Sequence, residues 1–179
     1  MWIKILAGVV LVIVLFIVVV ALQPSSFHIA RSASIAAPPQ VAFEQVNVIR
    51  NWEPWNPWLK LDPNVKTTYE GPAEGKGAIS RWVGDKNVGE GSMTIIESRP
   101  DELVRLRLDF LKPYESTCTA EFAFQPEGDH TMVTWSMDGE KNFVTKMIGL
   151  FMGMDKMIGE QFAKGLTDMN ATVAAKEKQ

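Results

Sequence analysis

The stretch from Asn142 to about Ala175 constrains the fold of this chain most, because its pattern predicts one long amphipathic helix. Apolar residues recur there in steps of three and four, at Phe143, Met147, Leu150, Phe151, Met154, Met157, Ile158, Phe162, Leu166, Met169 and Val173. Asn142 is suited to cap this helix, since its side chain can accept a hydrogen bond from a free amide of the first turn. A single apolar stripe of this length must be buried against another layer of the protein.

The same stretch is rich in methionine and glycine. From residue 147 onward it holds five methionines and four glycines, where a helix built for stability alone would carry leucine and alanine. Two interpretations follow. The helix is either an adaptable core element or the roof of a cavity that takes an apolar guest.

A second apolar segment lies near the amino terminus. Residues 5–22 contain no polar side chain, and a helix of that length rises about 27 Å, close to the hydrocarbon thickness of a bilayer. This predicts a transmembrane anchor over residues 1–23 and a folded domain over residues 24–179. The alternative is a cleaved signal peptide, but the apolar region of a signal peptide is usually shorter and ends at a small-x-small site, which this run lacks.

The basic residues around the apolar run favour one orientation. Lys4 and the terminal amine precede the run, and Arg31 is the first basic side chain after it. This small bias favours an amino terminus in the cytoplasm. We therefore expect a single-pass protein of a bacterial inner membrane, with its domain on the extracytoplasmic side.

Charge and cysteine content exclude some classes of protein. The formal net charge is −3, so no basic surface is expected to bind nucleic acid. Cys118 is the only cysteine, so an intrachain disulfide is impossible. A lone cysteine within a strand pattern is typical of a small core residue.

Between the two apolar segments the sequence alternates as a sheet does. Phe27–Ile35 predicts a first strand, and Pro39 can start a helix of about three turns after it. Further strands are expected at about 65–70, 77–83, 88–98, 102–111, 114–125 and 130–140, separated by short turns that make neighbours antiparallel. Each strand has one apolar and one polar face, and only the terminal helix is long enough to cover the apolar side.

Several short motifs occur in a fixed order along this pattern. They are Ala36-Ala37-Pro38-Pro39-x-Val41-Ala42-Phe43, Trp55-Asn56-Pro57-Trp58, Trp82-x-Gly84, Gly91-x-Met93-x-Ile95-x-Glu97-x-x-Pro100, Thr134-Trp135-x-Met137-x-Gly139 and Met154-Asp155-Lys156-Met157. Together they resemble the SRPBCC (START-like) superfamily, and within it the polyketide cyclase/dehydrase-like proteins, over about Phe27–Ala174. The resemblance implies an α+β helix-grip fold, a curved antiparallel sheet of about seven strands around the C-terminal helix, with an apolar cavity between them. It implies no single chemistry, because the superfamily holds lipid carriers, receptors and cyclases.

The sequence contains little that indicates catalysis. His28 and His130 are far apart in the pattern, so neither a metal site nor a cofactor is expected. A cyclase-type enzyme would need an acid or base facing the cavity, and Glu97 is the best candidate because it follows Met93 and Ile95 in alternation. The competing interpretation is that Glu97 is only a charged residue at the end of a strand. In that case the sequence identifies no catalytic residue.

The cavity is expected between the sheet, the terminal helix and a proline-rich segment that carries three tryptophans. Its predicted lining residues are Trp52, Trp55, Trp58, Trp82, Met93, Leu106, Leu108, Phe122, Trp135, Met147, Phe151 and Met154. The tryptophan segment and the helix are predicted to form opposite walls of the pocket. The alternative is that the rings only fill the core, since each can bury on the order of 200 Å² of apolar surface in either role.

Three classes of function remain open at this stage. The preferred one is a noncatalytic domain, anchored through residues 5–22, that binds a hydrophobic small molecule or lipid. The second is a cyclase or dehydratase-like enzyme acting on a hydrophobic substrate, which would need a buried carboxylate in the cavity. The third is a module that grips a protein partner of unknown identity through an exposed apolar patch.

Overall fold

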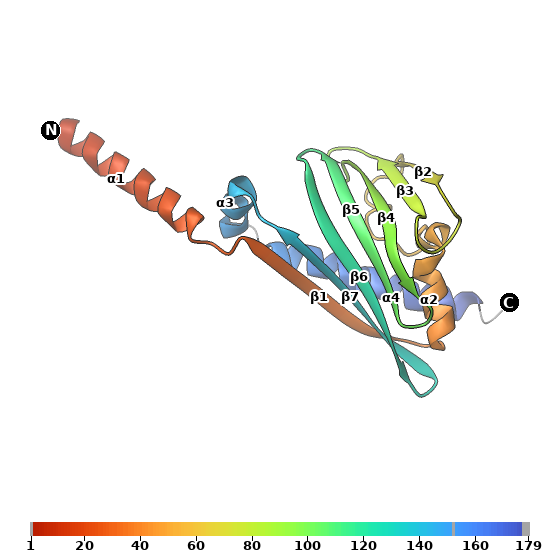
Figure 1. The fold of residues 1–179 in the computed structure, drawn as a ribbon. Coiled ribbons are helices and arrows are strands. Elements are labelled where there is room, and N and C mark those ends of the chain that lie inside the picture. The colour runs from red at the N-terminus through yellow and green to blue at the C-terminus, as the bar shows by residue number, and fades with distance from the viewer. Residues whose placement is uncertain (1, 152, 177–179) are drawn as a thin grey trace.

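The computed structural model describes residues 2–151 and 153–176, and its main feature is a curved sheet wrapped around one long helix (Figure 1). The sheet has seven antiparallel strands in the order β1-β7-β6-β5-β4-β3-β2. The strands are β1 (Ser26–Ile35), β2 (Lys66–Glu70), β3 (Ile79–Val83), β4 (Glu90–Arg99), β5 (Leu103–Lys112), β6 (Ser116–Glu127) and β7 (His130–Glu140). This is the predicted helix-grip architecture, and each predicted strand is present.

The helices are α1 (Trp2–Ala21), α2 (Pro39–Asn47), the short 3-10 helix η1 (Ile49–Trp52), α3 (Phe143–Phe151) and α4 (Met154–Lys176). Pro39 is the first residue of α2, where its missing N–H costs nothing. Along α4, Phe162, Leu166, Met169 and Val173 are fully buried. They belong to the predicted apolar stripe, which α4 lays across the concave face of the sheet in contact with β1 and β7.

The alternation along the strands sorts the two faces of the sheet as expected. Cross-strand pairing places Ile29, Met137, Ala120, Leu106 and Ile95 in one row on the inner face. All five are buried. The opposite face carries polar and charged side chains and no helix covers it among the described residues.

The C-terminal helical segment is two helices, so the prediction of one unbroken helix is wrong. α3 ends at Phe151 and α4 starts at Met154, whose first turn begins with a hydrogen bond from Met157 N to Gly153 O (3.0 Å). Glycine lowers the cost of leaving the helix at this point. The predicted cap is confirmed, because Thr145 N donates to Asn142 Oδ1 (2.9 Å) at the start of α3.

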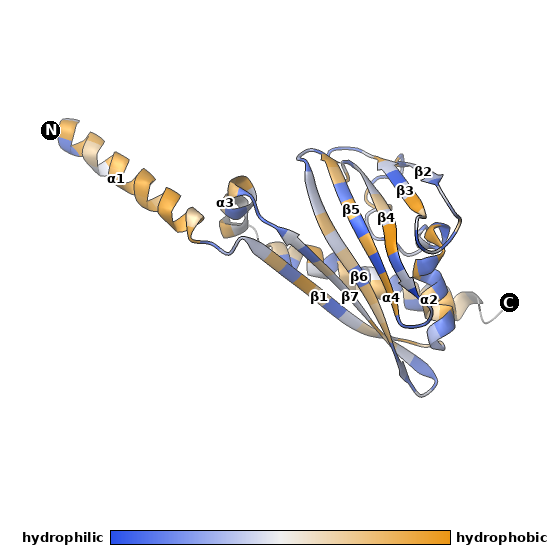
Figure 2. Ribbon diagram, in the orientation of Figure 1, coloured by the Kyte–Doolittle hydropathy of each residue, from blue (hydrophilic) through white to orange (hydrophobic). Residues whose placement is uncertain are grey.

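The break sends the two helices to different partners. α4 lies on the sheet, whereas α3 lies in contact with α1. For that reason Phe143 and Leu150 of α3, which were predicted to be buried in one stripe, remain exposed. Met157, on the second turn of α4, was predicted in the same stripe and is exposed as well. α1 itself projects from the domain and is apolar along almost its whole length (Figure 2).

Candidate functional site

The inner face of the sheet has two ends that differ in structure. At one end, called here the α3 end, β1 begins, β7 ends and the β5–β6 turn lies, since Ser26 pairs with Glu140 and Phe110 with Ser116. At the other end the sheet approaches α2. The predicted site residues divide between the centre of this face and its α3 end.

The centre is filled by five large rings, called here the aromatic block: Trp52, Trp55, Phe122, Trp135 and Phe162. Trp135 is stacked between Phe122, at a centroid distance of 4.7 Å, and Phe162, at 4.2 Å. Trp52 and Trp55 meet Trp135 edge to face, each at 5.9 Å. The block joins the sheet, the tryptophan segment and α4 into one packed unit.

Two indole N–H groups in the block have no hydrogen-bond acceptor among the described residues. They are Trp55 Nε1 and Trp135 Nε1, and Gln161 Oε1 on α4 is likewise buried without a partner in the part of the chain that the structure describes. Buried polar groups of this kind are rare in folded proteins and each costs about 1–3 kcal/mol when unpaired. They mark places where water or a polar atom of a ligand would be stabilised.

The α3 end of the inner face is built differently, with aromatic rings that cover glycines. The ring of Trp82 lies over Gly91, where an added Cβ would come within 2.5 Å of the indole, and the ring of Phe27 lies over Gly139 at 2.6 Å. Leu108 and Phe110 lie between them on β5. These side chains, called here the grip floor (Phe27, Trp82, Leu108 and Phe110), are only partly buried.

The first turns of α4 stand over the sheet at the α3 end and are fixed to β1. Arg31 donates to Asp155 through both Nη1 (3.3 Å) and Nη2 (3.0 Å), and its guanidinium lies so close to Gly159 that a Cβ there would collide with it. The hydrogen bond from Arg31 holds the pKa of Asp155 below its usual range, with desolvation opposing it. Met154 and Ile158 on these turns pack against the core and are only partly buried.

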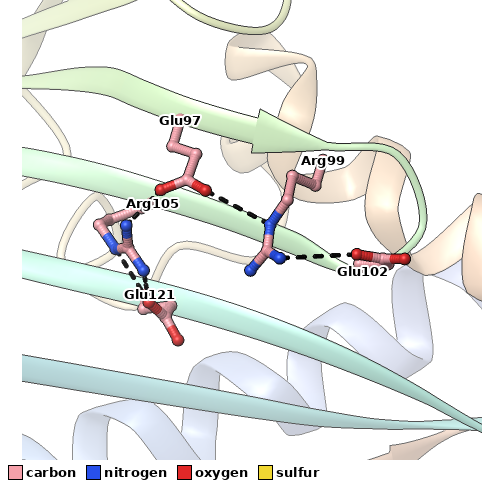
Figure 3. A network of polar contacts seen from close by, with 5 residues as sticks. All are labelled: Glu97, Arg99, Glu102, Arg105 and Glu121. Carbon is pink, nitrogen blue, oxygen red and sulfur yellow. Dashed lines mark hydrogen bonds and ion pairs between the residues drawn. The ribbon is translucent and has the colours of Figure 1, made fainter.

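Glu97 does not face the cavity, and the prediction that placed it there is wrong. The pairing of β4 with β5 shifts between Ile95 and Glu97, so Ile96 is an extra residue and the alternation reverses after it. Glu97 therefore lies on the outer face beside Arg105, which also binds Glu121, while Arg99 bridges Glu97 and Glu102 (Figure 3). Glu97 thus forms ion pairs with two arginines on the solvent-exposed face of the sheet, and these ion pairs have a structural role.

The buried acid found among the described residues, Asp62, also has a structural role. Its carboxylate accepts hydrogen bonds from Asn64 N (2.8 Å) and Asp85 N (2.8 Å), which ties two loops together. Cys118 is buried on the inner face, and burial raises the pKa of its thiol, so it is not poised as a nucleophile. No group of three or more possible metal-ligating side chains occurs among the residues described.

A shallow depression of about 450 Å³ lies at the α3 end of β1, β6 and β7. Most of its lining residues belong to the outer face of the sheet, namely Ser26, His28, Thr117, Thr119, Asp138 and Glu140, and the rest are Phe27, Cys118 and Gly139 of the inner face. The Nδ1 atom of His28 and the Oδ1 atom of Asp138 are 2.7 Å apart. The depression shares Phe27 with the grip floor and no residue with the aromatic block. No sequence pattern indicates this depression, because it depends on three strands meeting at one edge.

The predicted cavity residues are thus only partly brought together. Trp52, Trp55, Phe122 and Trp135 form the aromatic block, and Trp58 touches its edge at 5.6 Å from Trp135. Trp82 and Leu108 lie at the α3 end, and the buried Met93 and Leu106 lie on neighbouring strands. Met147 lies on α3, which packs on α1, and the side chain of Phe151 is outside the described residues. Their role in lining a ligand pocket stays a prediction.

The predicted cavity did not include Phe27, Phe110 and Ile158, although they lie beside Trp82, Leu108 and Met154 in the partly buried region. The strand glycines Gly91 and Gly139 could have indicated the α3 end, because a glycine inside a strand often marks the close approach of another group. The Arg31–Asp155 contact joins positions 124 residues apart and has no local pattern.

A sheet of seven antiparallel strands closed on a long C-terminal helix defines a helix-grip protein of the START and Bet v1 type. The chain belongs to the family described as "Polyketide cyclase / dehydrase and lipid transport", whose sequence pattern matches residues 26–174. A comparison with curated proteins gave no significant match.

Solved structures share the fold at low sequence identity. Protein MLL2253 from Mesorhizobium loti is 10% identical with a TM-score of 0.61, and the match covers 84% of this chain and 98% of that chain. Protein TTHA0849 from Thermus thermophilus is 19% identical with a TM-score of 0.58, covering 84% and 99%. Ara h 8.0201 is 10% identical with a TM-score of 0.59, also covering 84% and 99%. At these identities the likeness concerns the fold alone.

Proposed function

We propose that this protein is a membrane-anchored, noncatalytic domain that binds a hydrophobic small molecule or lipid between its sheet and α4. In this proposal residues 1–23 form the anchor and residues 24–179 the binding domain, on the extracytoplasmic side of a bacterial inner membrane. The family is described by lipid transport as well as by cyclase and dehydrase activity, which fits an apolar ligand.

The observation that carries the proposal is the incomplete burial of the grip floor. Phe27, Trp82 and Phe110 are apolar and face inward, yet they keep part of their surface accessible, whereas the aromatic block beside them is closed. An inward apolar surface that the protein itself leaves uncovered favours a ligand that covers it. Met154 and Ile158 would roof the ligand, and methionine adapts to guests of different shape.

The side chains of the grip floor suggest one further property of the ligand. They are apolar, so the part of the ligand that covers them is expected to be apolar too. A fatty acid derivative, a sterol-like molecule or a polyketide would satisfy this description.

The membrane anchor is supported by α1. It is the one helix among the described residues that is long and apolar enough to cross a bilayer, and it lies near the amino terminus. Nearly all of its large apolar side chains are exposed, from Trp2 to Val19. Burial in lipid would remove that surface from water.

The enzyme alternative has no such support. The carboxylate proposed for it, Glu97, is paired with Arg105 on the outer face. The carboxylate of Asp62 is bound to backbone amides. Both carboxylates are held by structural contacts, which favours the noncatalytic proposal.

Native mass spectrometry tests the proposal. Residues 24–179, purified without detergent, are expected to retain a lipid or other apolar metabolite, and Trp82→Ala is expected to lose it. Arg107→Ala on the outer face is the matched control and should retain the ligand, because its side chain contacts Asp109 rather than the floor. A domain that is well folded and takes up no apolar molecule, natural or added, would overturn the proposal.

A further inference from the structure

We propose that α3 is a second membrane contact, lying among the lipid headgroups beside the end of α1, so that the α3 end of the grip faces the bilayer. This inference rests on the proposed anchoring of α1. It adds a fixed orientation of the domain to an anchor that could otherwise be a loose tether.

The first support is the way α3 is held to the segment that follows α1. Lys141 N donates to Ser25 O (2.7 Å), and Lys146 Nζ donates to Ser25 Oγ (2.9 Å). α3 also contacts α1 directly, and Val20 in the last turn of α1 is the one buried residue of that helix. The two hydrogen bonds to Ser25 and the direct contact with α1 therefore hold α3 beside the end of α1.

Distance along the chain then places α3 near the bilayer. Ser25 is the fourth residue after Ala21, the end of α1, and four extended residues reach at most about 14 Å. The headgroup region on each side of a bilayer is about 5–8 Å thick. If α1 spans the membrane, α3 lies in or directly above the headgroups, as its position in the corner between α1 and β1 also indicates (Figure 1).

The surface of α3 suits that position. Phe143 is 48% exposed, Val144 41% and Leu150 38%. The only charged side chain of the helix is Lys146, which is bound to Ser25. Apolar residues exposed on a short helix that is held beside a membrane span are stabilised by insertion at the acyl boundary. In Figure 2, α1 is mainly in the hydrophobic colour and α3 carries the same colour over part of its length.

The β5–β6 turn gives this end of the domain a second apolar edge. The sheet register places the turn at the same end as the start of β1, and Leu111 and Tyr114 on it are both exposed. Tyrosine is enriched at membrane interfaces because its ring is apolar and its hydroxyl is polar. The grip floor lies at this same end of the sheet, so an apolar ligand that leaves the bilayer at this end would meet the floor first.

The experiment uses the full chain in phosphatidylcholine vesicles, labelled at single cysteines with an environment-sensitive fluorophore in a Cys118→Ala background. Val144→Cys reports on α3, Tyr114→Cys on the β5–β6 turn and Val12→Cys on the middle of α1. Lys164→Cys, on the exposed side of α4, is the control for a position in water. Lipids carrying a nitroxide near the headgroup or deep in the acyl chain serve as quenchers.

We expect the label at position 144 to emit at shorter wavelength than the label at 164 and to lose intensity with the shallow nitroxide. The label at position 12 should lose intensity with the deep nitroxide. If position 12 is quenched and both 144 and 114 behave like 164, α1 spans but α3 is no membrane contact, and the inference fails alone. If position 12 is also unquenched, the anchor itself is wrong.

A protein occupant of the α3 face would give a different result. A second copy of the chain would shift the emission at position 144 without nitroxide quenching, and labels on two copies would quench one another. That outcome would also overturn the inference. Circular dichroism and the quenching at position 12 check that each labelled chain is folded and inserted.

Discussion

At the centre of the inner face Phe122, Trp135 and Phe162 stack with no side chain more than 2% exposed, whereas at the α3 end Phe27, Trp82 and Phe110 keep part of their rings accessible. Both regions are aromatic and both face α4 or the space beside it. They differ in what closes them. The centre is closed by the tryptophan segment and the buried stripe of α4. At the α3 end the first turns of α4, with the partly buried Met154 and Ile158, give a less complete cover, and α3 packs on α1 instead of on the sheet.

The comparison teaches that stability and ligand binding are carried by different parts of one apolar surface. Close packing at the centre holds the sheet to α4, so changes there should be costly. The looser packing at the α3 end leaves room for a guest, so changes there should affect binding more than folding. Four predictions test this division.

The largest effect is expected for Trp135→Ala in the aromatic block. The indole is stacked on two rings and meets three further tryptophans, so its removal leaves a large cavity. We expect the free energy of unfolding to fall by about 3–5 kcal/mol in urea denaturation of residues 24–179. A loss below about 1 kcal/mol would mean that the block is not the stabilising centre.

Two glycines of α4 provide a matched pair. At Gly165 an added Cβ would be 2.8 Å from Trp135 and 3.1 Å from Pro57, and neither can move freely, so Gly165→Ala should destabilise by about 1–3 kcal/mol. At Gly159 the Cβ would meet the flexible guanidinium of Arg31, which can shift. Replacing glycine by alanine stabilises the helix by up to about 1 kcal/mol. The shift of Arg31 would weaken its contact with Asp155, so the two effects of Gly159→Ala oppose each other and the net change in stability should be small.

Thermal melts of the two glycine variants check this pair. The comparison between the centre and the α3 end fails if Gly159→Ala is as damaging as Gly165→Ala. Equal tolerance of both substitutions would contradict the close packing of Trp135 against α4.

Trp82→Ala should separate binding from stability. Because the Trp82 ring is part of the grip floor and only partly buried, we expect the affinity for an apolar fluorescent dye to fall about tenfold, or about 1.4 kcal/mol. The melting temperature should fall less than for Trp135→Ala. Phe43→Ala, whose ring packs on Phe124 away from the floor, should show the reverse order of effects.

The smallest effect concerns pH at the first turn of α4. Arg31 lowers the pKa of Asp155 in the folded protein, so the stabilisation by this pair is present above the unfolded pKa of aspartate, about 3.9, and is lost as pH falls through the lower folded pKa. Asp155→Asn should therefore be slightly less stable than the parent chain near neutral pH and equal to it in acid. Melting curves of both chains from pH 7 to pH 3 measure the difference, and a gap that stays constant with pH would exclude the ion pair as its cause.

The sequence alone determined the strands, their inner faces, the apolar N-terminal helix and the family, because each depends on local alternation or on short motifs. Leu106 and Phe122 were assigned to the inner face from parity, and both are fully buried. The cap at Asn142 was likewise local, since it requires only a side chain three residues before the amide it binds.

Only the tertiary structure decided where Glu97 points and where the C-terminal helix breaks. The extra residue Ile96 exists only relative to the register of β5, so parity counted along β4 alone placed Glu97 on the wrong face. α3 and α4 are separated because the sheet holds one and α1 the other, and Gly153 lets the chain turn between them. Because α3 packs on α1 and not on the sheet, the grip floor stays partly uncovered. The periodicity of residues 142–175 could not reveal this, since it does not show which partner each helix packs on.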